Sequence, residues 1–221
     1  TLIETPRGGL VQVKVTANAG ATSLTVSAVN YTIESSATAL YYGNMYMVGN
    51  NATVMYRYNV GTNTWATTSA NSGNPAIPAV PGTVGGGCGL KWMPAYEPNK
   101  LYCVRGNASS NMYTYDLVNN VWATLTYYPS TETFTTGVSI SVRQSGSKNS
   151  SLIIKSTTNN KFFEYIPYKG IMDVKLTNQQ MVEGTAVAGD KMSIIKSPDG
   201  IDYLFVLGAS TNALIRCPLI D

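Results

Sequence analysis

The sequence contains no histidine, and this absence limits the chemistry that its side chains can perform. Histidine is the commonest general base and the commonest transition-metal ligand in proteins. Its absence excludes a Ser–His–Asp or Cys–His catalytic arrangement. Paired carboxylates, as in glycosidases, are the main remaining device. Glu132 and Glu164 are the pair that one face of the predicted fold would bring together, but solvated loop carboxylates are the favoured interpretation.

A short acidic segment resembles a calcium site but has a plainer interpretation. Residues 197–202 read SPDGID, which places two aspartates around a glycine. No EF-hand loop follows this segment. A hairpin turn at Asp199-Gly200 explains the pattern better. The sequence therefore predicts no metal, no cofactor and no enzymatic activity.

The chain has three cysteines, and an odd number cannot all pair within one chain. Their spacing matches no zinc pattern. Cys88 and Cys103 are expected on neighbouring strands, where a disulfide is one alternative; the third cysteine is Cys217. Buried free thiols are the favoured interpretation, since cysteine often behaves as a small apolar residue.

Several aromatic residues are candidates for contact with a partner, because aromatic side chains are enriched at interfaces. The candidates are Trp92, Tyr96, Tyr127 and Tyr128. The first two belong to the stretch KWMPAYEPNK, which we expect to be a long hairpin loop. The Pro/Gly-rich stretch 69–87 precedes it and is too long for a routine connection. A tolerated insertion is the favoured interpretation of that stretch, and a functional contact is the alternative.

A sequence pattern that occurs twice determines the predicted architecture. Trp65 recurs 57 residues later as Trp122. The residues Met55, Tyr56, Tyr58 and Asn63 recur at the same offset as Met112, Tyr113, Tyr115 and Asn120. Each copy contains two apolar runs, a Tyr-rich alternating run and a run that opens with tryptophan, separated by turn residues. Each copy therefore predicts a four-stranded antiparallel meander.

Two weaker copies follow, and the last has three strands without a fourth. The segment GGLVQVKV near the N-terminus alternates as a half-buried strand does. We expect it either to complete the last copy, closing a ring without open edges, or to form a separate arm. The predicted divisions are 1–34 for the N-terminal strands and, within 35–221, about 35–70, 85–127, 137–177 and 184–221 for the four copies.

The first two copies resemble the kelch repeat, which is also seen in the propeller of galactose oxidase. In that family a blade reads apolar-Tyr-x-apolar-Gly-Gly, then Tyr-Asp, then Asn-x-Trp. The matching residues are Tyr46, Val48, Gly49, Tyr58, Asn59, Asn63 and Trp65 in the first copy, and Tyr102, Val104, Gly106, Tyr115, Asp116, Asn120 and Trp122 in the second. The resemblance covers residues 35–127 well and 137–221 poorly, and Gly-Asn stands where the family has Gly-Gly.

This resemblance implies an all-β fold, a kelch-like propeller of about four blades with four antiparallel strands each. It implies that Tyr58, Trp65, Tyr115 and Trp122 are core residues, with each tryptophan packed between adjacent blades. The copper chemistry of galactose oxidase is not implied, because the histidine ligands that it requires are absent.

Composition carries the remaining expectations. Charged residues make up 12% of the chain, the net charge is +3, and no basic run occurs, so no nucleic-acid partner is expected. No apolar run is long enough to span a bilayer, so no membrane partner is expected. The chain begins with Thr1 rather than methionine, which favours a processed chain or part of a longer one.

Two functions from different classes fit this sequence. The first is a non-enzymatic structural module of an extracellular assembly, most concretely a bacteriophage or virus particle, whose partners are protein subunits, including copies of itself. The second is a carbohydrate-binding propeller of a secreted or surface protein. The second reading requires tryptophan and tyrosine residues clustered with carboxylates at one end of the ring.

Overall fold

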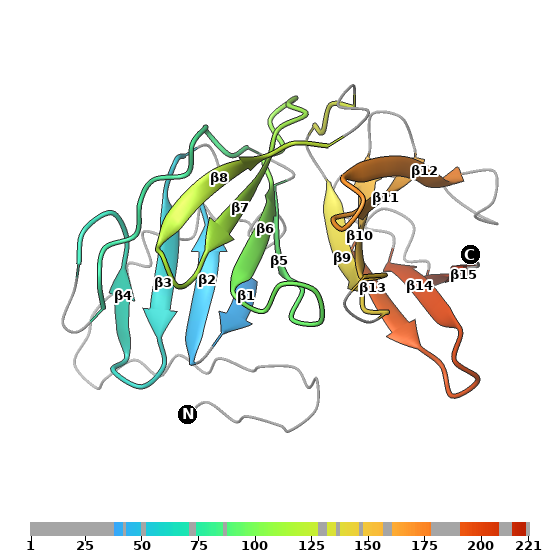
Figure 1. Ribbon diagram of the computed structural model, residues 1–221, viewed down its shortest axis with the longest axis horizontal. Helices are drawn as coiled ribbons and strands as arrows, with labels where there is room; N and C mark the ends of the chain where they lie inside the picture. The colour runs from blue at the N-terminus through green and yellow to red at the C-terminus, as the bar shows by residue number, and fades with distance from the viewer. Residues whose placement is uncertain are drawn as a thin grey trace, which may run out of the picture. The chain divides into compact units, whose positions relative to one another are not determined.

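The structure is a computed structural model that describes residues 38–41, 43–49, 52–70, 74–85, 88–127, 132–135, 138–145, 148–156, 161–177, 191–207 and 214–219. The chain divides into two compact units, residues 1–30 and 31–221, and all described residues belong to the second. Every regular element among the described residues is a β-strand (Figure 1), which confirms the all-β prediction. The predicted N-terminal strand and its role in ring closure lie outside the described residues.

The described strands form four antiparallel sheets, and within each sheet the strands follow one another in chain order. Sheet 1 contains β1 (Thr38–Tyr41), β2 (Asn44–Val48), β3 (Met55–Asn59) and β4 (Thr64–Ala66). Sheet 2 contains β5 (Gly89–Trp92), β6 (Lys100–Val104), β7 (Met112–Asp116) and β8 (Val121–Leu125). Sheet 3 contains β9 (Ser139–Arg143), β10 (Ser151–Ser156), β11 (Lys161–Ile166) and β12 (Ile171–Thr177). Sheet 4 contains β13 (Lys191–Lys196), β14 (Asp202–Leu207) and β15 (Leu214–Leu219).

Tight turns join the strands, and several of them use a residue in the left-handed region. Gly43 lies between β1 and β2 with φ 74°, where the sequence predicts a Gly-Asn hairpin. Asn63 and Asn120 lie at equivalent places, between β3 and β4 and between β7 and β8, with φ 54° and 56°. Glycine and asparagine tolerate this region better than other residues do. The two copies of the repeat therefore use the same turn residue for the same reason.

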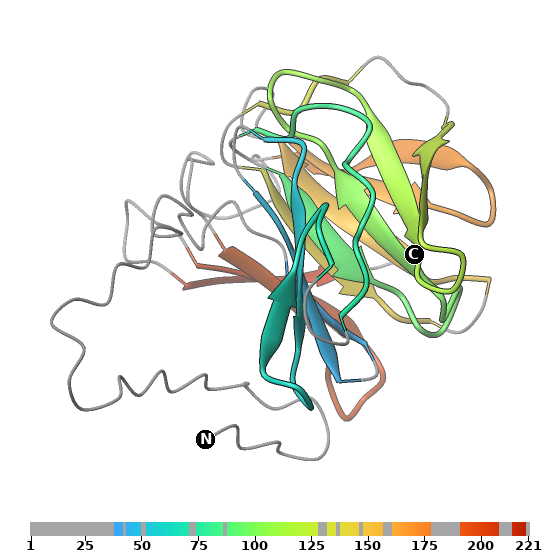
Figure 2. The ribbon, with the colours of Figure 1, turned by 90° about the vertical axis from the view of Figure 1, so that its left-hand side faces the viewer.

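The four sheets pack one after another, and their first strands are neighbours. Strand β1 lies beside β5, β5 beside β9, and β9 beside β13. Figure 2, viewed from the side of sheet 1, shows the β1–β4 sheet in front of the sheets that follow it. A separate hydrophobic cluster fills each junction: between sheets 1 and 2, between sheets 2 and 3, and between sheets 3 and 4. Sheets 2 and 3 therefore have a hydrophobic core on each face, as expected for a sheet that lies between two others.

The first strands approach one another closely. A Cβ added to Gly89 of β5 would lie 2.2 Å from Cγ2 of Ile140 in β9. No real pair of carbon atoms tolerates that distance. Position 89 therefore needs glycine for β5 and β9 to be neighbours.

The Pro/Gly-rich connection between sheets 1 and 2 is a structural strap, which corrects its favoured interpretation as a tolerated insertion. Asn74 is buried, and its Nδ2 donates to the carbonyl oxygens of Arg57 and Thr64 at 3.1 and 3.0 Å. Ile77 is buried in the cluster between sheets 1 and 2. Backbone groups of Val80 and Val84 donate to loop carbonyls of sheet 1. The strap thus fills the junction that the two sheets leave open.

The repeated Tyr–Trp pairs have the same internal geometry in both copies. The rings of Tyr58 and Trp65 lie 4.9 Å apart at 42°, and those of Tyr115 and Trp122 lie 5.0 Å apart at 46°. The hydroxyl of each tyrosine donates to the side-chain oxygen of the turn asparagine that follows it. The repeat identified in the sequence is therefore a structural repeat at this local level.

The burial of the two tryptophans differs, and this corrects the expectation that Trp65 is a core residue. Trp65 is 46% exposed, whereas Trp122 is partly buried against the cluster between sheets 1 and 2. The indole N–H of Trp122 donates to the carbonyl oxygen of Pro78 in the strap at 3.0 Å. The physical reason is position, since Trp122 faces a sheet and a strap, and Trp65 has no equivalent cover among the described residues.

The cysteines follow the favoured interpretation. Cys88, Cys103 and Cys217 are buried, and none of them forms a disulfide. Burial raises the pKa of the Cys88 thiol to about 12, so this thiol stays protonated at neutral pH. This finding confirms the prediction of buried free thiols.

Candidate binding site

The four predicted contact residues fall into different environments. Trp92, at the end of β5, packs on the cluster between sheets 1 and 2, and its indole N–H donates to the carbonyl oxygen of Pro98 at 2.7 Å. Tyr127 is buried, its ring lies 6.0 Å from that of Tyr165, and its hydroxyl donates to the carbonyl oxygen of Ser110. Tyr128 lies outside the described residues. Tyr96 is partly buried, as Trp92 is, and packs against the cluster between sheets 2 and 3.

Tyr96 is held by a compact loop between β5 and β6. The amides of Tyr96 and Glu97 both donate to the carbonyl oxygen of Met93 at 3.0 Å, and Met93 is fully buried. The amide of Lys100 then donates to the carbonyl oxygen of Glu97 at 3.2 Å. This backbone arrangement fixes the side chains of residues 96 and 97 on the same loop, above the core between sheets 2 and 3.

Glu97 is the carboxylate at the centre of this loop. Its Oε1 lies 2.6 Å from Nζ of Lys100, and its Oε2 accepts a hydrogen bond from the hydroxyl of Tyr102. Burial, followed by the hydrogen bond to Glu97, raises the pKa of the Tyr102 hydroxyl, which therefore remains a donor at neutral pH. A carboxylate has about four acceptor positions, so Glu97 retains capacity for another ligand.

A second loop, from sheet 3, comes close to the first. Tyr168 lies in the turn 167–170 between β11 and β12, and its side chain is 55% exposed. The Nζ of Lys148 lies 5.3 Å from the centroid of the Tyr168 ring, a cation–π distance. Burial raises the pKa of Tyr96, Glu97 raises it further, Lys100 lowers it, and Tyr168 raises it least, so Tyr168 lies within electrostatic range of Tyr96.

We call the polar and aromatic side chains of these loops, together with Lys148 of the β9–β10 loop, the aromatic–carboxylate cluster. Its members are Tyr96, Glu97, Lys100, Lys148 and Tyr168. Aromatic rings offer a flat apolar surface, and the carboxylate and ammonium groups offer hydrogen bonds around it. This combination suits a ligand that has both C–H faces and hydroxyl groups. The sequence placed Tyr96 here, but it gave no sign that Tyr168 would lie nearby.

Glu132 and Glu164, the carboxylate pair considered for glycoside hydrolysis, interact with other residues of the chain. Glu164 is buried in β11 and accepts from Ser151 Oγ at 2.6 Å, with Nζ of Lys175 at 3.1 Å. Glu132 lies near Tyr127, and its charge contributes to raising the pKa of that hydroxyl to about 12, after burial. Within the described part of the chain, no group of three histidine, cysteine, aspartate or glutamate side chains is placed to hold a metal ion.

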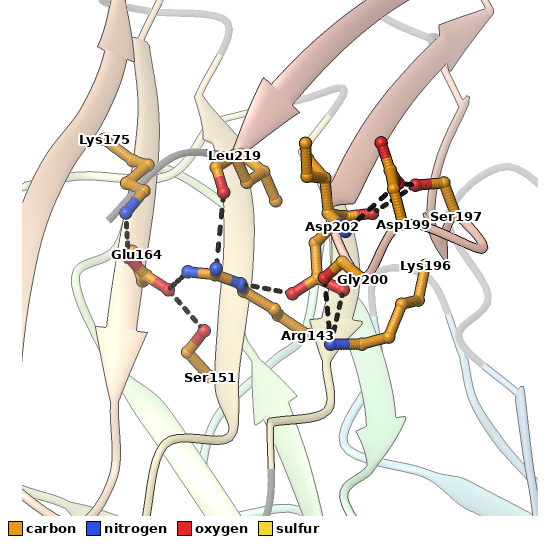
Figure 3. Close-up of polar contacts among 11 residues, drawn as sticks. Arg143, Ser151, Glu164, Lys175, Lys196, Ser197, Asp199, Gly200, Asp202 and Leu219 are labelled. Carbon is orange, nitrogen blue, oxygen red and sulfur yellow. Dashed lines mark hydrogen bonds and ion pairs between the residues drawn. The ribbon is translucent and has the colours of Figure 1, made fainter.

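A buried ionic network joins sheet 3 to sheet 4 (Figure 3). Arg143 of β9 donates through Nε to Asp202 Oδ2 at 2.8 Å and through Nη2 to the carbonyl oxygen of Leu219 at 3.3 Å. Its Nη1 lies 3.5 Å from Oε1 of Glu164. Each of these charges has an opposite partner, which buried charges require. The network is a structural joint, and the sequence signalled it weakly, by an arginine within the strand-like run SISVR.

The segment 197–202 forms the predicted hairpin turn. Gly200 has φ 86°, its amide donates to the carbonyl oxygen of Ser197 at 2.9 Å, and the amide of Ser197 donates to that of Ile201 at 2.9 Å. Asp199 accepts from Ser197 and Ile201 within the same turn. The Asp199-Gly200 prediction is confirmed, and the oxygen atoms of Asp199 bond to the turn itself.

Across the ranges that the structure describes, no helix has the length and apolar character needed to cross a lipid bilayer.

Solved structures show the fold to which these sheets belong. An auxiliary nutrient-binding protein from Bacteroides thetaiotaomicron VPI-5482 matches with a TM-score of 0.51 at 12% identity, over 80% of this chain and 46% of that one. A protein of unknown function from the same organism matches with a TM-score of 0.53 at 10% identity, over 78% of this chain and 40% of that one. No protein-family model and no curated protein matches the sequence. The chain spans less than half the length of these two structures, and at this identity the likeness shows the fold alone.

Proposed function

We propose that this chain is a non-enzymatic carbohydrate-binding module that acts outside the cell, and that the aromatic–carboxylate cluster is its binding site. The observation that carries the proposal is that loops of the adjacent sheets 2 and 3 carry an exposed tyrosine ring with an ammonium group over it, and a second tyrosine beside a carboxylate and a second ammonium group. The nutrient-binding role named for one similar structure supports a binding function for this fold.

The proposed architecture is a kelch-like propeller, and each sheet is one blade. Its support is the sequence of four meandering sheets whose first strands are neighbours, together with the repeated Tyr–Trp geometry. In a propeller, the loops at one end of neighbouring blades converge and form ligand sites. The loops that carry Tyr96 and Tyr168 are of this kind, because each joins two antiparallel strands at one end of its sheet.

In the proposed complex, a sugar ring places its C–H face on Tyr168. One or two sugar hydroxyls donate to Glu97, and Lys100 and Lys148 donate to sugar oxygens. Such a site holds its ligand by a few stacking and hydrogen-bonding contacts, each of which contributes about 1 kcal/mol. Weak binding, with dissociation constants near the millimolar range for a monosaccharide, is therefore expected.

A glycan array followed by calorimetric titration of the best saccharide tests the proposal. Tyr168→Ala removes the stacking surface and should weaken binding about tenfold, whereas Tyr168→Phe keeps the ring and should change it little. Glu97→Gln removes the charge and should weaken binding severalfold. An array without any specific hit, or a Tyr168→Ala variant that binds as the wild type does, would show the proposal to be wrong.

A second candidate is the structural module of an extracellular assembly such as a bacteriophage or virus particle. The observation that favours it is the apolar surface on the outward faces of the first and last sheets, including Trp65, Leu207 and Leu214. Mass spectrometry and cryo-microscopy of particles from the native source test this candidate. Recovery of the chain only as free protein, absent from any particle, would contradict it.

A further inference from the structure

The junctions between sheets inside the chain all have the same polarity. Side chains of a strand alternate between its two faces. In β3, Met55 points to the face that packs forward onto sheet 2, and in β7, Tyr113 and Tyr115 point to the face that packs backward onto sheet 1. In β11, Phe163 and Tyr165 pack backward onto sheet 2, and Phe162 packs forward onto sheet 4. Each inner sheet therefore has a forward face and a backward face, both buried.

Sheet 1 has its forward face in the core, but its backward face is open. This backward face carries Tyr56 and Tyr58, both half-buried, and Trp65, which is 46% exposed. The equivalent tyrosines of sheet 2, Tyr113 and Tyr115, are 3% and 1% exposed. The tyrosines that are core residues in the second copy are therefore only partly buried in the first.

In sheet 4 the backward face is buried and the forward face is exposed. Its backward face packs on sheet 3 through Leu204, Val206 and Cys217, among others. Its forward face exposes Ile195, Leu207 and Leu214, at 54%, 51% and 66%. The register places these residues on one surface with the half-buried rings of Tyr203 and Phe205, because Ile195 pairs with Tyr203 and Leu207 pairs with Leu214. Lys191 and Arg216, which lies over the Tyr203 ring, are at the border of this apolar surface, and apolar surface of this kind marks interaction sites on soluble proteins.

We propose that a second copy of this chain covers both open faces, with the forward face of sheet 4 in each copy packed on the backward face of sheet 1 in the other. This contact continues the polarity of the three junctions within the chain, and it pairs an apolar strand face with a Tyr–Trp face as the junction between sheets 1 and 2 does. The two contacts are identical and close on themselves, which gives a dimer rather than a filament.

The size of the resulting assembly fits the fold. Two copies place about eight sheets around one axis, which is within the range of known propellers. The similar structures are single chains of which this chain covers 46% and 40%, so two copies supply about the length of one such chain. The aromatic–carboxylate cluster lies on sheets 2 and 3, away from both faces, and the proposal does not depend on carbohydrate binding.

Size-exclusion chromatography with light scattering on the full chain is the first test. The expected mass is twice that of one chain at micromolar concentration. Trp65→Arg and Leu214→Arg each place an unpaired charge in both contacts of the dimer, so each variant alone should be monomeric, with dissociation at least about a hundredfold easier. Leu207→Arg is a second test of the sheet 4 face, because Leu207 lies on β14 and pairs with Leu214 of β15. Val118→Arg is the matched control, because Val118 is also 66% exposed but lies in the β7–β8 turn, and this variant should stay dimeric.

Mixing the two monomeric variants is the decisive test. Trp65→Arg keeps an intact sheet 4 face and Leu214→Arg keeps an intact sheet 1 face, so the mixture should form a one-to-one heterodimer through one contact. Circular dichroism of each variant establishes that it is folded. A wild-type chain that is monomeric at about 100 μM overturns the proposal. A Leu214→Arg variant that stays dimeric, or variants that fail to pair on mixing, overturn it as well, because sheet 1 would then pair with itself or with nothing.

Discussion

The two copies of the repeat have the same ring geometry and different surroundings. Tyr58–Trp65 and Tyr115–Trp122 agree within 0.1 Å in ring separation, since the distances are 4.9 and 5.0 Å. Yet Tyr115 is 1% exposed, and Trp65 is 46% exposed. A local pattern of side chains thus fixes the turn, the strand pairing and the ring contact. Whether those rings lie in a core depends on what the rest of the fold, or a partner, places over them.

The strap accounts for much of this difference. Over the second copy, Asn120 Nδ2 donates to the carbonyl oxygen of Ala76 at 3.0 Å, and the indole of Trp122 donates to that of Pro78 at 3.0 Å. Asn63 and Trp65 have the same donor groups at the equivalent positions, but Trp65 is 46% exposed. The comparison therefore predicts that equivalent substitutions in the two copies lower the free energy of unfolding by unequal amounts.

The largest difference is expected at the tyrosines. Tyr115→Ala removes a fully buried ring and should lower the free energy of unfolding by about 3–5 kcal/mol. Tyr58→Ala removes a half-buried ring and should lower it by about 1–2 kcal/mol. Urea denaturation of both variants, followed by circular dichroism at a protein concentration where the chain is monomeric, measures the difference. Equal losses would show that the backward face of sheet 1 is as well covered as that of sheet 2.

The tryptophans should show a smaller difference. Trp122→Phe removes the hydrogen bond to Pro78 and part of the packing, at a cost of about 1–3 kcal/mol. Trp65→Phe should cost about 0.5 kcal/mol or less in the monomer, because the ring is at the surface. Thermal unfolding of the two variants checks this order. A Trp65→Phe variant that loses more stability than Trp122→Phe would contradict the assignment of Trp65 to the surface.

The strap itself can be weakened without touching either ring. Asn74→Ala leaves the carbonyl oxygens of Arg57 and Thr64 without their donor, and Arg57 Nε without its acceptor at 2.6 Å. This change should cost about 1–3 kcal/mol. Tryptophan fluorescence should also shift to longer wavelength, because Trp122 becomes more exposed when the strap detaches. Ser69→Ala, at an exposed position earlier in the same connection, is the control; an equal loss in that variant would show that the effect is not specific to Asn74.

The smallest expected effect is a loss of folding stability at alkaline pH, which arises from Tyr127 in the second copy. Tyr127 stands where the first copy has Ala70, and burial raises its pKa to about 12. The unfolded chain releases this proton near pH 10, so stability is complete below about pH 10 and falls as the pH rises toward about 12. Tyr127→Phe should remove part of this fall, about 0.5–1 kcal/mol at pH 10.5–11. Unfolding curves at pH 8 and pH 10.5 test the sign; a wild type that becomes more stable at the higher pH would contradict it.

The sequence predicted the elements well because their signals are local. The Tyr-rich strands, the left-handed asparagine turns and the Asp199-Gly200 hairpin each depend on residues that are neighbours in the chain. The exposure of Trp65 and the burial of Tyr127 depend on which distant segment covers them, and no local pattern contains that information. Prediction of the binding cluster was limited for the same reason, since Tyr96 and Tyr168 come from different sheets.

The joint at Arg143 was also outside the reach of the sequence. Its partners Asp202 and Glu164 lie 59 and 21 positions away, and no sequence pattern links either of them to Arg143. An acidic residue within a strand-like sequence is normally predicted to lie at the surface, because buried carboxylates are rare without a partner. The partner becomes visible when sheets 3 and 4 are placed side by side (Figure 3).

The contact between Gly89 and Ile140 limits which residues homologous sequences can have at these two positions. A methyl group at position 89 would overlap Cγ2 of residue 140 at 2.2 Å, so the two positions cannot vary independently. Homologous sequences should show a compensating pair: a larger residue at 89 should occur together with alanine or glycine at 140. In the laboratory, Gly89→Ala should be rescued by Ile140→Ala more than the separate effects of the two changes would allow.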